Sequence, residues 1–121
     1  LGIVDINDAT VNNSINVFYR AVGTVGINIF SSGVNVYDTT PLATAIQPNS
    51  LVKTAVGYIL NNPMAAVNSS LGTVGTSCPI PATTQMVIGA KAAGIYLNGH
   101  IKRLTYFNKR LTNQQLQYLT R

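Results

Sequence analysis

The chain closes with the stretch Asn98-Gly-His-Ile-Lys-Arg-Leu-Thr-Tyr-Phe-Asn-Lys-Arg-Leu-Thr-Asn-Gln-Gln-Leu-Gln-Tyr-Leu-Thr120. Asn-Gly is the strongest short turn signal, because glycine adopts a positive φ freely and asparagine tolerates one. The residues after it predict a strand in which Leu104 and Tyr106 share one face. Arg103 and Thr105 then lie on the opposite face. A strand that leads into a short helix is typical of the closing element of a β domain.

The helix signal lies in residues 111–119. Thr112 and Gln115 have the spacing of a capping box, in which each side chain bonds the backbone N–H of the other residue. Leu111 and Leu116 occupy the two positions of a hydrophobic staple. Leu116 and Leu119 give the helix a single apolar edge. We therefore expect a short helix that docks on the body of the domain.

Short strands with turn signals between them fill the rest of the chain, at spacings of roughly 8–12 residues. Apolar and polar residues alternate with a period of two in several of them. Residues 51–60 are apolar on both faces, as expected of a strand central to a two-layer core. Residues 69–81 are irregular, and residues 91–94 predict a loop. The expected strands are 1–6, 14–20, 25–30, 34–37, 51–60, 64–67, 84–89 and the segment that starts at 95.

This count predicts one domain over residues 1–121, with an all-β fold. The expected architecture is an antiparallel β-sandwich of jelly-roll type with one short C-terminal helix. A chain of 121 residues is long enough to bury a core.

The composition combines 46% hydrophobic with only 9% charged residues, so Asn, Thr, Ser and Gln must cover the surface. Such a surface suits recognition of neutral polar groups, or packing against sister subunits. The net charge of +5 is dispersed, without a basic arm, so no nucleic-acid partner is expected. No apolar run reaches the roughly 20 residues that span a bilayer, so no membrane insertion is expected. The start at Leu1 suggests a processed product or a piece of a longer chain.

The closing stretch resembles the C-terminal signature of concanavalin A-like (LamG-like) jelly-roll domains. It is most similar to the versions near the ends of phage tail fibre and tail spike proteins. There, a G-x-I-x-R-L-x-Y strand runs into R-L-S/T-x-x-x-L. The residues that fit are Gly99, Ile101, Arg103, Leu104, Tyr106, Arg110, Leu111, Thr112 and Leu116.

Residues 4–15 resemble the hairpin I-x-D-G-T-x-x-N-R-I of the same family, with Ala9 in place of the Gly and Ser14 in place of the Arg. Family members usually carry one or two strands before this hairpin. Either a neighbouring segment completes the sheet or the chain is a shortened form. The resemblance implies a virion or extracellular location and a host-surface glycan as partner. It also implies a homo-oligomer, such as a trimer, or contact with neighbouring virion proteins.

Catalytic chemistry is not expected. Glycoside hydrolysis generally needs two carboxyl groups that flank the bond. The chain has no Glu, and its three acids are Asp5, Asp8 and Asp38, of which the first two lie in one hairpin and suit turn roles. A nucleophile–histidine pair would need His100, and no cue brings Cys78 to it.

Sugar binding needs amides, hydroxyls and carboxylates for the sugar hydroxyls, and an aromatic face for the ring. Tyr37 beside Asp38, at a strand end, is expected to be exposed and is the best aromatic candidate. Loop amides supply the rest. The alternative for each residue is turn chemistry. The candidate carbohydrate-binding residues are Asn12, Asn13, Tyr37, Asp38, Asn61 and Asn62.

No cofactor is expected, and calcium is a weak possibility, because it needs clustered oxygen ligands. Asp8 with Asn12 and Asn13, or Asp38 with loop carbonyls, could supply them.

Two hypotheses follow. In the first, the domain is a non-catalytic recognition module of a phage tail fibre or similar surface appendage, and its loops bind host-surface carbohydrate. In the second, it is a structural or oligomerisation module of a virion or fibre and binds no sugar.

Overall fold

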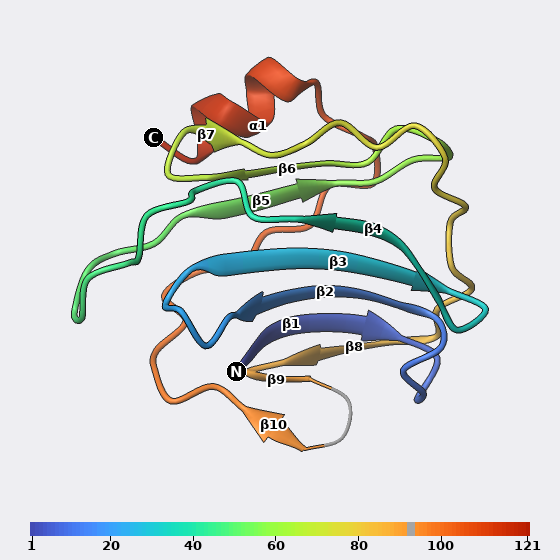
Figure 1. Ribbon diagram of the computed structural model, residues 1–121, viewed down its shortest axis with the longest axis horizontal. Helices are drawn as coiled ribbons and strands as arrows, with labels where there is room; N and C mark the ends of the chain where they lie inside the picture. The colour runs from blue at the N-terminus through green and yellow to red at the C-terminus, as the bar shows by residue number, and fades with distance from the viewer. Residues whose placement is uncertain (92–93) are drawn as a thin grey trace.

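The computed structural model describes residues 1–91 and 94–121. They form an all-β sandwich of two antiparallel sheets, with one short helix over the smaller sheet (Figure 1). The larger sheet has the order β4-β3-β2-β1-β8 and the smaller β5-β6-β7, while β9 and β10 form a separate ribbon. The bounds are β1 Gly2–Asn7, β2 Ser14–Tyr19, β3 Val25–Ser31, β4 Val34–Thr39, β5 Thr54–Gly57, β6 Met64–Val67, β7 Ser70–Leu71, β8 Gln85–Ile88, β9 Ala90–Lys91, β10 Ile95–Tyr96 and α1 Asn113–Leu119.

This architecture confirms the predicted all-β sandwich with a C-terminal helix. The finer jelly-roll class stays a prediction. The first four predicted strands are confirmed as β1 to β4, which pair as antiparallel neighbours. The alternation of apolar and polar residues located β2, β3 and β4. The predicted loop at 91–94 lies partly outside the described residues.

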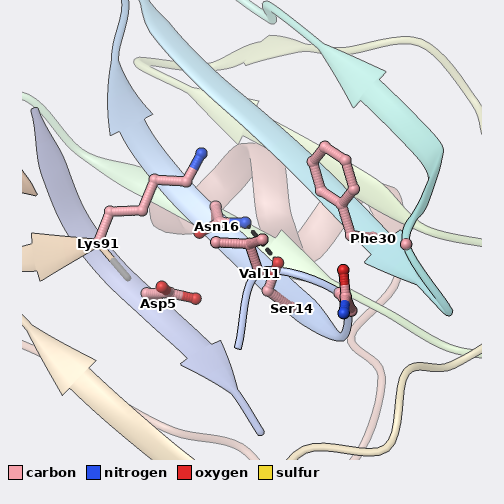
Figure 2. A pocket seen from close by; sticks show the side chains of 8 residues that line it. Asp5, Val11, Ser14, Asn16, Phe30 and Lys91 are labelled. Carbon is pink, nitrogen blue, oxygen red and sulfur yellow. Dashed lines mark hydrogen bonds between the residues drawn. The ribbon is translucent and has the colours of Figure 1, made fainter. Parts of the chain in front are cut away.

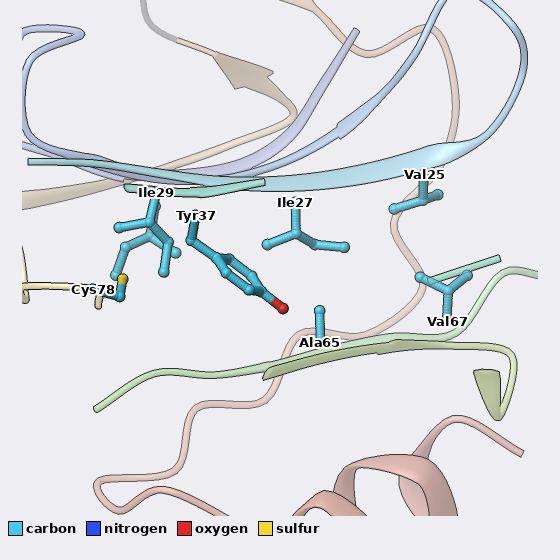
Figure 3. Close-up of a cluster of buried hydrophobic side chains, with 8 residues drawn as sticks. Val25, Ile27, Ile29, Tyr37, Ala65, Val67 and Cys78 are labelled. Carbon is cyan, nitrogen blue, oxygen red and sulfur yellow. The ribbon is translucent and has the colours of Figure 1, made fainter. Parts of the chain in front are cut away.

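The main core lies between the two sheets (Figure 3). Ile27 and Val25 project from β3 toward Ala65 and Val67 of β6. Cys78 is buried in the same cluster, and burial raises the pKa of its thiol. It is therefore a small apolar core residue, as free cysteines often are.

Strand β6 is buried along its whole length, because it is covered on both sides. Its Ala65 and Val67 face the main core, while Met64 and Ala66 pack against Leu116 of the helix. A strand covered on two faces must be apolar at every position.

The sequence placed such a central strand at residues 51–60, and this prediction is wrong. Only Thr54–Gly57 pairs there, as the edge strand β5. The chain reverses immediately afterwards, because Asn61 adopts a left-handed φ of 56° and the Asn62 amide donates to the Ile59 carbonyl at 3.0 Å. Ile59 and Leu60 are consequently exposed.

The helix begins as predicted. Thr112 accepts from the Gln115 amide at 3.2 Å, and the Gln115 side chain accepts from the Thr112 amide at 2.9 Å. Leu116 is 2% exposed, but Leu119, expected on the same apolar edge, is 47% exposed. The helix turns about 100° per residue, and its docked face is centred on Leu116, Gln117 and Thr120, which points Leu119 outward. Gln117 donates to the Ser69 carbonyl, and the Thr120 hydroxyl accepts from the Ser69 amide.

The strand predicted after Asn98-Gly99 does not form. Residues 101–107 contain neither helix nor turn, and Leu104 and Tyr106 are exposed. Within the described part of the chain, no backbone–backbone hydrogen bond joins residues 101–107 to another segment. The pattern of a strand is present, but no neighbouring strand lies beside it to pair with.

We expect Leu116→Ala to lower the free energy of unfolding by about 2–5 kcal/mol, because it opens a cavity between α1 and β6. Leu119→Ala is the matched control and should change this free energy by about 0.5 kcal/mol or less. Urea unfolding followed by circular dichroism measures both. Equal losses in the two variants would contradict the docking of the helix through Leu116.

Candidate functional site

A line of polar side chains crosses the face of the five-stranded sheet that points away from the core. Asp5 of β1 pairs with Asn16 of β2, Asn16 pairs with Asn28 of β3, and Asn28 pairs with Asp38 of β4. The period of two puts these four side chains on one face, because their apolar neighbours fill the other. We call Asp5, Asn16, Asn28 and Asp38 the polar row.

The middle of the polar row is buried, although it lies on the outer face. Asn16 is 1% and Asn28 6% exposed. The Nδ2 of Asn16 donates to Ser14 Oγ at 2.8 Å. The Oδ1 atoms of Asn16 and Asn28 have no hydrogen-bond partner among the described residues. A buried acceptor left without a donor costs about 1–3 kcal/mol, so such atoms are rare in native proteins.

Cationic and aromatic side chains lie beside the polar row. The Nζ of Lys91 lies 4.9 Å and the guanidinium carbon of Arg20 5.0 Å from the centre of the Phe18 ring. Gly26 makes room for Arg20, since a Cβ there would lie 2.5 Å from its Nε. Arg20 also forms an ion pair with Asp38. Each cation–π contact contributes roughly 0.5–1 kcal/mol and orients these long side chains.

A cavity of about 160 Å³ opens beside Asn16 on this face (Figure 2). Lys91 extends over it from β9, and Val11 reaches in from the β1–β2 turn. At roughly 30 Å³ per water molecule it has room for about five waters, which is below the roughly 300 Å³ of a drug-sized pocket. Its lining residues are Asp5, Val11, Asn12, Ser14, Asn16, Phe30, Gly33 and Lys91.

The cavity therefore suits one small ring or one end of a longer ligand. Asn16 offers an acceptor, Ser14 a hydroxyl and Lys91 an ammonium group, and Phe30 offers an apolar ring face. A ligand group that both donates and accepts hydrogen bonds, such as a hydroxyl, matches this set.

Two of the candidate residues from the sequence lie at the β1–β2 turn. Asn12 lines the cavity, and its carbonyl accepts from the Gly33 amide at 2.9 Å. Asn13 holds the turn in place: its Oδ1 accepts from the Ser32 amide at 3.0 Å and its Nδ2 donates to Asp8 at 2.8 Å. Asn13 therefore stabilises the turn and does not line the cavity, whereas Asn12 does both.

Tyr37 is not the exposed aromatic that the sequence suggested, and this expectation is wrong. It is 6% exposed and belongs to the main core, where its hydroxyl donates to the Thr73 carbonyl at 2.7 Å (Figure 3). Burial raises the pKa of this hydroxyl. The reason is the strand period: since Asp38 takes the outer face, its neighbour Tyr37 must take the inner one.

Asn61 and Asn62 lie in the β5–β6 turn of the other sheet and do not line the cavity. Asn61 bonds Cys78 twice: its amide donates to the Cys78 carbonyl at 2.9 Å, and its Oδ1 accepts from the Cys78 amide at 3.1 Å. These bonds stabilise the turn. The candidate residues are therefore not brought together into one site.

The acids do not gather into a metal site in the described residues, where no group of three potential His, Cys, Asp or Glu ligands occurs. Both carboxylate oxygens of Asp8 already accept hydrogen bonds, from Thr10 and Asn13. The Thr10 hydroxyl and then Asn13 hold the pKa of Asp8 below its usual value.

Asp5 and Asp38 lie at opposite ends of the polar row, three strand spacings apart. At about 4.8 Å per spacing, their Cα atoms are separated by roughly 14 Å. This exceeds the roughly 5–9.5 Å between the carboxyl pairs of glycosidases. The separation supports the expectation of a non-catalytic domain, which stays a prediction.

Comparison with known proteins supports the fold. No protein-family model matches the chain, and no curated protein matches it. One solved structure, an S-layer domain-containing protein (residues 221–444) from Clostridium thermocellum, is similar with a TM-score of 0.52 and 17% sequence identity. The similarity covers 100% of this chain and 63% of that one. At this identity the two share a fold. Over the described residues, no helix combines the length and the apolar character needed to cross a membrane.

The sequence did not single out Asn16 and Asn28 as site residues, although a signal for them exists. Both stand between two branched apolar residues, in the triplets Ile15-Asn16-Val17 and Ile27-Asn28-Ile29. An amide at an interior strand position, repeated in the next strand, marks a polar line across the outer face.

We expect Tyr37→Phe to lower the free energy of unfolding by about 0.5–1.5 kcal/mol, because the Thr73 carbonyl loses its donor. Tyr96→Phe, at an exposed tyrosine, is the matched control and should stay within about 0.5 kcal/mol of the parent. Urea unfolding measures both. A Tyr37→Phe variant with parental stability and weakened sugar binding would instead make this hydroxyl a ligand contact.

Proposed function

We propose that the domain is a non-catalytic recognition module that binds carbohydrate in the cavity beside the polar row. The observation that carries the proposal is Asn16 Oδ1, a buried amide oxygen of a cavity-lining residue, which lacks a donor among the described residues. A sugar presents several hydroxyls in fixed directions, and each can donate to one such oxygen. A bound sugar hydroxyl would supply a donor to Asn16 Oδ1 that the described residues do not supply.

In this mode, one sugar hydroxyl donates to Asn16 and accepts from Lys91, which both line the cavity (Figure 2). Phe30 contacts the apolar face of the ring. Hydrogen bonds of about 1 kcal/mol each support a dissociation constant near a millimolar, which corresponds to about −4 kcal/mol. Several copies that engage one glycan surface raise the overall avidity by about 10²–10⁴-fold.

Two observations support a proposal about the biological setting. The closing sequence resembles domains of phage tail fibres and tail spikes, and the similar solved structure belongs to an S-layer domain-containing protein. We therefore propose a location on a virion or outside the cell, in a surface appendage, with a host-surface glycan as the ligand.

Glycan-array screening identifies the sugar, and calorimetry then compares two variants. Asn16→Ala should weaken binding at least about tenfold, the equivalent of about 1.4 kcal/mol, because the acceptor for the sugar hydroxyl is removed. The variant also loses the hydrogen bond from Asn16 to Ser14, so urea unfolding must show that it remains folded under the binding conditions. Asn62→Ala, in the β5–β6 turn, is the control and should bind as the parent. Parental binding by Asn16→Ala together with a loss in Asn62→Ala would move the site to the loops, and binding to no glycan would contradict the proposal.

The second candidate is a structural module that joins subunits or neighbouring virion proteins. The core face of the five-stranded sheet is left uncovered at β8. Along one row on this face, Ile29 is 1% exposed and Ile15 3%, while Met86 at the end of the row is 41% exposed. Ile88 ends the next row at 55%. Contiguous exposed apolar residues of this kind mark interaction sites.

If copies of the chain associate over β8 as trimers or other oligomers, Ile88→Lys should shift them to monomers in light scattering. Val22→Lys, at a valine in the β2–β3 turn that is more exposed than Ile88, is the control and should leave the mass unchanged. A parent that is monomeric at every concentration would contradict self-association over this face.

A further inference from the structure

Residues 101–107 combine three features that occur together nowhere else in the described chain. Their backbone makes no backbone–backbone hydrogen bond to another described segment. Their apolar side chains are largely exposed, including Leu104, Tyr106 and Phe107. Their charged side chains, Lys102 and Arg103, are exposed and all of one sign.

The backbone of residues 101–107 is available to pair with an added strand. Unpaired N–H and C=O groups along an irregular, accessible segment form a template on which another strand can add. Ile95 and Tyr96 already pair with β9, and α1 begins at Asn113, so both ends of the segment are held. A segment anchored at both ends loses little conformational entropy when a strand pairs with it.

The side chains give a further argument. In an extended pairing, Leu104 and Tyr106 share one face, and the apolar residues of an added strand would cover them. Tyr106 also contacts Tyr58, whose hydroxyl pKa is raised by burial and then by Tyr106. Tyr58 packs against the main core, so the added strand would extend an existing packed layer.

The charge of residues 101–107 favours an acidic strand over a second copy of the chain as the binding partner. The chain offers no carboxylate to this segment, because Asp5 is fully buried, Asp38 pairs with Arg20 and Asp8 is bound within its own turn. A second copy would bring Lys102 and Arg103 against themselves, and cations on an edge oppose such self-pairing. An acidic strand would neutralise them.

We propose that residues 101–107 are a docking site for an extended acidic segment of a partner protein, which adds as a β-strand. The partner segment alternates carboxylate with apolar side chains. Its backbone bonds residues 101–107, its carboxylates face Lys102 and Arg103, and its apolar residues cover Leu104 and Tyr106. This goes beyond glycan recognition and uses a different surface from the cavity.

The probe is a fluorescent ten-residue peptide that alternates glutamate with valine, and its control has lysine in place of glutamate. Fluorescence polarisation should detect the acidic peptide at least about tenfold more tightly than the basic one. Added salt should weaken the acidic complex, because the charges are exposed. The double variant Lys102→Glu and Arg103→Glu should reverse the preference. Equal binding of the two peptides to the parent would overturn the proposal.

Proline variants test the backbone pairing. Neighbouring N–H groups of an extended strand point to opposite edges, so either Leu104→Pro or Thr105→Pro should abolish binding and the other should not. Both should keep the parental melting temperature, since these amides are unbonded. Thr105→Ala is the control, and Asn16→Ala should bind the peptide normally, which separates this site from the glycan site.

Two results would overturn strand addition by an acidic partner. One is undiminished peptide binding in both proline variants. The other is a dimer of the free domain that a proline at 104 or 105 dissociates, because a second copy would then occupy the segment.

Discussion

The structure depends on the register of the five-stranded sheet. One residue step separates the side chains that fill the core from those that form the polar row, because the strand period is two. Ile15 and Ile27 face β6 while their neighbours Asn16 and Asn28 face outward. A slip of one residue would put amides in the core and isoleucines in the cavity. The apolar face therefore fixes the alignment of the site.

The packing of the second layer follows from that face. β6 carries Ala65 and Ala66 at its centre, and small side chains let the large sheet on one side and α1 on the other approach closely. Tyr37 fills the space beside Ala65, and its hydroxyl is bonded to the Thr73 carbonyl. The helix is thus a cover for β6, and its capping box sets where that cover begins.

The sequence predicted those elements correctly whose formation depends on neighbouring residues in the chain. Alternation located β2 to β4, and the Thr112–Gln115 pair located the start of α1. Sequence failed where the outcome depends on a distant neighbour. The pattern of residues 101–107 is that of a strand, yet pairing needs an adjacent edge that the described chain does not provide. The apolar run 51–60 was likewise taken for a central strand, but only Thr54–Gly57 pairs, at the edge of the smaller sheet.

In the candidate site, too, the sequence identified residues with local roles and missed those whose role depends on the fold. Asn12 was found because turn residues are visible in sequence, whereas Tyr37 was misjudged because its exposure depends on which face β4 turns to the core. Asn16 and Asn28 were passed over because an amide within a strand normally only faces water. Their significance arises from pairing across β2 and β3, which places them side by side.

The burial of these amides has a thermodynamic consequence. A buried oxygen without any donor raises the free energy of the folded domain by about 1–3 kcal/mol. The total free energy that stabilises a small domain is only about 5–15 kcal/mol. An apolar residue at either position would avoid that cost. Under the proposed function, a sugar hydroxyl would supply a donor to Asn16, and part of the cost would be recovered on binding.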